Sequence, residues 1–68
     1  MAVTDVLKGR WQQLKGNVKQ RWGELTDDDL TQIDGSREAL EGRLRARYGH
    51  DEARIRKEVD EWYEEQGL

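Results

Sequence analysis

Apolar residues recur at intervals of three and four along most of the chain, and no stretch alternates apolar and polar positions as a half-exposed strand does. The first such run lies near the N-terminus and contains no proline. It predicts one amphipathic helix over about residues 4–22, with its apolar stripe facing the core. The stripe consists of Leu7, Trp11, Leu14, Val18 and Trp22.

Three shorter helices are predicted downstream, each preceded by a residue that favours a helix N-terminus. These N-cap residues are Thr26, Ser36 and Asp51. Asp29 stands at the capping-box position after Thr26, and Gly35 and Gly49 end the second and third predicted helices. The apolar faces are Leu30 and Ile33, then Leu40, Leu44 and Tyr48, and then Ile55, Val59 and Trp62.

This pattern predicts an all-α fold for residues 1–68, which are enough for a single small domain. The four helices are joined by connectors of only a few residues, so neighbouring helices are expected to pack as hairpins. The four stripes and Leu25 supply a core of fourteen side chains. With 34% hydrophobic and 40% charged residues and no cysteine, this core offsets the chain entropy only narrowly.

Glycine recurs every seven residues in the first predicted helix, at Gly9, Gly16 and Gly23, on the side opposite the apolar stripe. Gly23 is placed to cap the helix, whereas each of the other two costs about 1 kcal/mol relative to alanine. One interpretation is neutral drift or a deliberately frayed first helix. The other is a smooth surface that another backbone approaches closely.

Charge is distributed in blocks along the chain. Residues 1–22 hold five basic side chains and one acidic, whereas residues 23–36 hold five acidic and no basic side chains. Residues 37–48 are again basic and residues 49–68 acidic. Such blocks attract each other, and the basic ones also suit an anionic partner. The candidate interaction surface therefore comprises Lys8, Gly9, Arg10, Lys15, Gly16, Lys19, Arg21, Arg43, Arg45 and Arg47.

Two anionic partners fit parts of this pattern. The stretch IDGSREAL is similar to a helix-hairpin-helix turn, but it has one glycine where two are usual, and the pI of 5.1 is low for a DNA-binding domain. The first predicted helix has Trp and Leu on one face and basic flanks, as in helices that lie on anionic membranes. The same apolar face is needed for the core, so neither partner is favoured over a solvated surface.

The sequence lacks the combinations of residues that catalysis and metal binding require. His50 is the only histidine and has no cysteine or matching serine to activate, so we expect no enzyme activity and no cofactor. The run Asp27-Asp28-Asp29 lacks the alternating spacing of a calcium loop and is explained by helix capping and the helix dipole. No apolar run is long enough to span a membrane and no signal peptide follows Met1, which favours a cytoplasmic protein.

The stretch KGRWQQLKGNVKQRWGELTDDDL resembles the opening signature of the CsbD-like family of small bacterial general stress proteins. Further matching positions are Ile33-Asp34-Gly35, Leu40, Gly42, Tyr48-Gly49 and Glu58-Val59. The main departure is arginine in place of many lysines in residues 37–48. The resemblance implies a four-helix, SAM-like domain of two packed hairpins, abundance under general or osmotic stress, and a hydrophilin-like character. It implies no catalytic or binding residues.

Two functional hypotheses follow. The preferred one is a non-enzymatic, monomeric stress protein that shields client proteins through its hydrated surface, as the mean hydropathy of −1.14 suggests. The alternative is a binding module for an anionic partner, either nucleic acid or a membrane surface, through residues 8–21 and 37–47.

Overall fold

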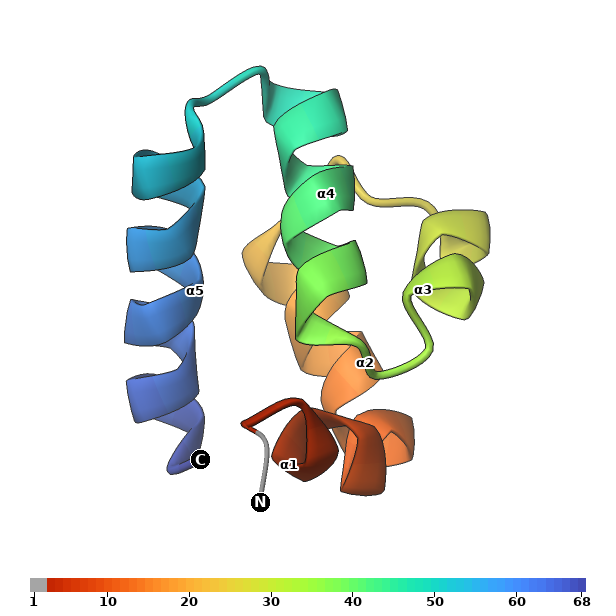
Figure 1. Cartoon of the computed structure of the whole chain (residues 1–68). Coiled ribbons are helices and arrows are strands. Elements are labelled where there is room, and N and C mark those ends of the chain that lie inside the picture. Colours follow the sequence, from red (N-terminus) through yellow and green to blue (C-terminus); the bar gives the residue numbers. More distant parts are fainter. Residues whose placement is uncertain (1–2) are drawn as a thin grey trace.

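The computed structural model describes residues 3–68, with side chains from Val6 onward, and this part of the chain contains five α-helices and no strand (Figure 1). The helices are α1 (Val3–Gly9), α2 (Trp11–Arg21), α3 (Asp27–Ile33), α4 (Arg37–Tyr48) and α5 (Glu52–Gln66). The all-α prediction is therefore confirmed for the described residues.

The prediction of one continuous helix over residues 4–22 is wrong, because the chain leaves the helical conformation at Arg10 (φ −117°, ψ 15°). The amide of Arg10 donates to the carbonyl of Leu7 at 3.2 Å, and α2 then starts from the carbonyl of Arg10. The bend directs α1 across the end of α4 (Figure 1). Gly9, which has a low helix propensity, directly precedes the bend.

The three predicted N-caps are confirmed. Thr26 and Asp29 form a complete capping box, and the side chains of Ser36 and Asp51 accept hydrogen bonds from the third amide of their helices. The predicted helix ends are shifted slightly. Trp22 rather than Gly23 is the C-cap of α2, and α3 ends at Ile33.

Helix α4 is the centre of the arrangement (Figure 1). Helix α5 packs antiparallel to it, whereas α3 and α1 contact α4 from other sides. Arg37 ties α4 to α5, because its guanidinium pairs with Asp60 and lies 4.8 Å from the ring centroid of Tyr63. The same guanidinium donates to Glu41 at 2.8 Å.

Among the side chains that the structure describes, fourteen apolar ones are buried and form the core, and thirteen of these were predicted. Tyr48 was predicted to be buried but is half-exposed at the edge of the core, where its hydroxyl accepts a hydrogen bond from the amide of Glu24. Tyr63, which was not predicted, is buried instead and packs edge-on against Trp62. Trp22 and Trp62, with ring centroids 5.8 Å apart, join the segment after α2 to α5.

One glycine allows a close approach between backbones. A Cβ atom on Gly35 would lie 2.6 Å from the Cα of Lys8, and Gly35 has a φ of +81°. Helix α1 therefore packs against the α3–α4 turn at a distance that only glycine permits. A Cβ atom on Gly9 or Gly16 would meet nothing within 4 Å in the described part of the chain, so neither glycine lies against another segment of this chain.

Candidate functional site

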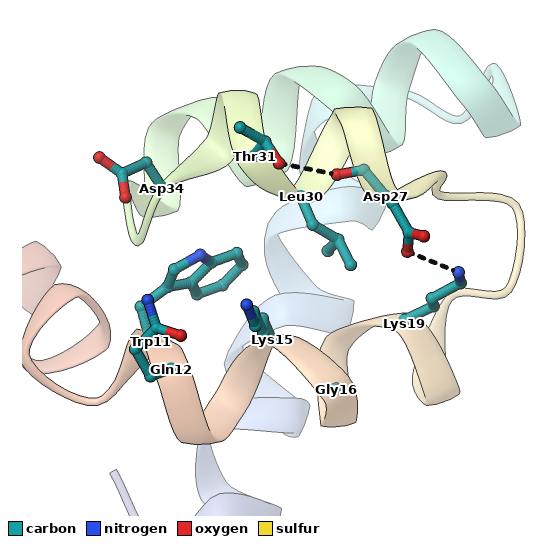
Figure 2. A pocket seen from close by; sticks show the side chains of 9 residues that line it. All are labelled: Trp11, Gln12, Lys15, Gly16, Lys19, Asp27, Leu30, Thr31 and Asp34. Atoms are coloured by element: carbon teal, nitrogen blue, oxygen red, sulfur yellow. Dashed lines mark hydrogen bonds and ion pairs between the residues drawn. The ribbon is translucent and has the colours of Figure 1, made fainter.

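A groove lies between α2 and α3, and we call it the α2–α3 groove (Figure 2). Its volume is about 360 Å³. It is lined from α2 by Trp11, Gln12, Lys15, Gly16 and Lys19, and from α3 and its C-cap by Asp27, Leu30, Thr31 and Asp34. The groove is thus basic along one wall and acidic along the other.

The apolar part of the α2–α3 groove is formed by Trp11 and Leu30, which are each only 6% exposed. An ion pair between Lys19 Nζ and Asp27 Oδ1, 2.8 Å apart, links its two walls (Figure 2). The hydrogen bond and the positive charge of Lys19 lower the pKa of Asp27. The hydroxyl of Thr31 donates to the backbone carbonyl of Asp27 at 3.1 Å, so it is already engaged within α3.

The structure distributes the predicted candidate surface over several faces. Lys15, Gly16 and Lys19 lie together along the α2–α3 groove. The guanidinium of Arg21 lies elsewhere, 5.1 Å from the ring centroid of Trp22 and within 3.9 Å of Glu58.

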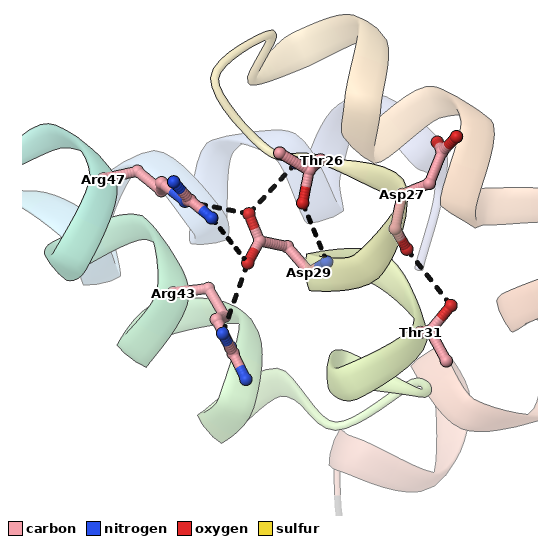
Figure 3. A network of polar contacts seen from close by, with 6 residues as sticks. All are labelled: Thr26, Asp27, Asp29, Thr31, Arg43 and Arg47. Atoms are coloured by element: carbon pink, nitrogen blue, oxygen red, sulfur yellow. Dashed lines mark hydrogen bonds and ion pairs between the residues drawn. The ribbon is translucent and has the colours of Figure 1, made fainter.

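The arginines of α4 are also separated from this groove. Arg45 lies with Glu38, Glu41 and Glu52 around a smaller groove between α4 and α5. Arg43 and Arg47 point instead toward Asp29 of α3 (Figure 3). The basic residues of 8–21 and 37–47 therefore do not form one continuous basic face.

Asp29 is the one charged side chain that is buried in the described part of the chain, at 1% exposure. Arg47 donates to both of its carboxylate oxygens, from Nε at 2.9 Å and from Nη2 at 3.1 Å. Arg43 adds a bond of 3.2 Å, and the backbone amide of Thr26 adds one of 3.0 Å. Such a fully bonded carboxylate tolerates burial.

These bonds lower the pKa of Asp29 to about 2, chiefly through the hydrogen bond from Arg47 and then through the backbone of Thr26. The same carboxylate therefore caps α3 and fastens α3 to α4. The sequence pattern predicted the capping role of Asp29 but not its ion pair with the two arginines. The available signal was the i, i+4 spacing of Arg43 and Arg47, which places both on one face of a helix next to an acidic segment.

Other candidate chemistry is sparse in the described residues. They contain no group of three histidine or acidic side chains arranged to hold a metal ion. His50 stacks on Tyr48 with ring centroids 5.8 Å apart, in the turn between α4 and α5. No helix within residues 3–68 has the length and apolar character needed to cross a membrane.

Comparison with known proteins identifies the family. Residues 5–57 match the CsbD-like family model, so the chain belongs to the CsbD-like family. It is 50% identical over 58 residues to the UPF0337 protein YjbJ of Escherichia coli O6:H1, covering 85% of this chain and 84% of that protein. It is 54% identical over 56 residues to a UPF0337 protein of Pseudomonas aeruginosa, covering 82% and 86%. No solved structure matches the chain.

Proposed function

We propose that this protein is a non-enzymatic, cytoplasmic stress protein that protects other proteins through its hydrated surface. The observation that carries the proposal is the separation of apolar and charged side chains. Among the side chains described, fourteen apolar ones are buried, and Val6 is the one large apolar side chain that is exposed, at 40%. A surface so poor in apolar patches has little tendency to aggregate.

The surface charges support the same role. The chain carries 12 basic and 15 acidic residues, and several of them pair within one helix turn. Arg54 pairs with Glu58, and Arg56 with Glu52, at i, i+4 spacing along α5. Interspersed charges of both signs keep a protein soluble at high concentration. Placed between unfolding client proteins, such molecules separate the apolar surfaces of the clients.

The family resemblance adds a finer proposal about architecture, namely a SAM-like domain of two packed hairpins. The antiparallel packing of α4 and α5 supports one of these hairpins. An experimentally determined structure superposed on SAM-type domains tests the assignment. Matching helix order and crossing angles would support it, and a different arrangement of α1, α2 and α3 around α4 would reject it.

Protection is tested by freezing and thawing an aggregation-prone enzyme with this protein, and with an equal mass of an inert globular protein. The proposal expects more residual enzyme activity and less light scattering with this protein. Equal protection by the inert protein would contradict the proposal.

A second candidate function is the binding of an anionic partner. The observation that favours it is the position of Lys15 on the basic wall of the α2–α3 groove, beside Trp11, where Lys19 already binds one carboxylate, that of Asp27. Binding to duplex DNA or to anionic vesicles should then weaken steeply with salt, because neutralised phosphates release counterions. Lys15→Glu should weaken the binding and Lys57→Glu, on α5, should not. Absence of binding at low salt would eliminate this candidate.

A further inference from the structure

The bend between α1 and α2 is weakly specified by the sequence. Arg10 is the N-cap of α2, but its side chain forms no capping hydrogen bond, and the first turn of α2 has no acidic residue. No proline is present to interrupt the helix. Only one residue separates the two helices, so a change in the backbone angles of Arg10 is enough to join them.

The apolar stripe also continues across the bend. Leu7, Trp11 and Leu14 are spaced by four and then three residues, which places them on one face of a straight helix. In the bent form Leu7 is fully buried and Trp11 is 6% exposed. The same side chains thus suit either a bent or a straight helix, provided that Leu7 finds an equivalent place to pack.

Such a place exists on every copy of the chain. We call it the α1 docking site, and it consists of the face of α4 that α1 contacts together with Gly35, whose backbone lies against Lys8. If α1 straightens into line with α2, it leaves this site and carries Leu7 out into solvent. The one surface certain to fit a displaced α1 is the vacated α1 docking site of a second copy, since all the contacts are the same.

We propose that α1 is an exchangeable arm, and that straightening at Arg10 allows two copies of this chain to swap α1 and form a dimer. The bent monomer dominates at low concentration, because its own α1 is tethered next to the docking site and association costs translational and rotational freedom. Gly9 favours the bent form, because it is the last residue of α1 there and would become an interior residue of the straight helix, where glycine is disfavoured. This assigns a function to the glycine that precedes the bend, and it does not depend on the protective role.

Gly9→Ala tests the proposal, with Gly16→Ala as the matched control. Both variants replace an exposed glycine on the side of α1 and α2 opposite the apolar stripe. A Cβ atom added at Gly9 or at Gly16 meets nothing within 4 Å. Residue 9 lies at the end of α1 in the bent form and in the interior of the straight helix, whereas residue 16 is interior in both. Gly9→Ala should therefore favour the straight form by up to about five-fold per chain, and the dimer by up to about 25-fold. Sedimentation equilibrium should show this shift for Gly9→Ala and none for Gly16→Ala. Arg10→Gly, which disfavours a straight helix, should lower the dimer fraction below that of the wild type.

A second measurement identifies what fills the docking site. The chain has no cysteine, so single thiols can be introduced at chosen positions. In one Gly9→Ala chain, Lys8→Cys puts a thiol on the arm. In a second Gly9→Ala chain, Asp34→Cys puts a thiol beside the docking site. After the two are mixed at high concentration, a short bismaleimide should link one chain to the other. A Gly9→Ala protein as monomeric as Gly16→Ala, or a dimer with no such link, would overturn the proposal.

Discussion

Arg47 of α4 donates two hydrogen bonds to the carboxylate of Asp29, which is the third residue of α3, belongs to its capping box and is 1% exposed. The pair joins two consecutive helices of opposite charge. Arginine suits this position because its planar guanidinium matches both carboxylate oxygens at once. The basic character of α4, which suggested an external anionic partner, is thus partly used within the protein.

Replacing Asp29 with asparagine should destabilise the domain more than any replacement of its exposed neighbours. Asparagine keeps the shape but loses the charge that Arg43 and Arg47 require. Circular dichroism melts of Asp29→Asn and Asp28→Asn at neutral pH provide the comparison, since Asp28 is exposed and on the same helical turn. Equal melting temperatures for the two variants would show that the pair contributes nothing.

The same pair predicts a pH dependence. Because folding lowers the pKa of Asp29 from 3.8 to about 2, its contribution is fully present above pH 4 and is lost as the pH falls through 2. The difference in unfolding free energy between wild type and Asp29→Asn should therefore shrink across this interval. Urea titrations at several pH values measure it. A difference that stays constant between pH 4 and 2 would contradict the assignment.

Gly16→Ala should stabilise the domain by about 1 kcal/mol, because alanine favours helix and restricts the unfolded chain. The structure leaves open space for the added methyl group. For a domain of this size, the melting temperature should rise by roughly 4–8 °C. A lower melting temperature would place Gly16 in a tighter environment than the one observed.

Gly35→Ala should have the opposite effect. Alanine at position 35 would have to adopt a φ of +81°, and its Cβ atom would lie only 2.6 Å from the Cα of Lys8. Gly49→Ala is the matched control, because Gly49 also has a positive φ of +70° but has no atom within 4 Å of an added Cβ. The positive φ alone costs about 1 kcal/mol or more, and Gly35→Ala should exceed Gly49→Ala by the cost of displacing α1. Equal losses of stability in the two variants would mean that α1 does not pack closely against Gly35.

The features that the sequence predicted well are local. Thr26, Ser36 and Asp51 act on amides three residues away, so their sequence context defines the cap. Apolar periodicity likewise identified nearly all of the core, because burial on a helix follows its repeat.

The features that the sequence missed depend on tertiary placement. Arg10 bends because Leu7 has a docking site on α4, although the local sequence favours a continuous helix. The ion pair of Asp29 requires knowing that α3 lies on α4. Tyr63 replaces Tyr48 in the core because α5 is covered on a wider face than its stripe of Ile55, Val59 and Trp62 indicates.

In the proposed function, a charged, hydrated surface protects other proteins. This role is tested most directly by a variant in which four exposed charges of α5 become alanine, namely Lys57, Glu61, Glu64 and Glu65. Alanine preserves the helix, so circular dichroism should show an unchanged fold. In the freeze–thaw assay over a series of concentrations, the account predicts that this folded variant protects the enzyme less well than the wild type at equal mass. Equal protection at every concentration would contradict it.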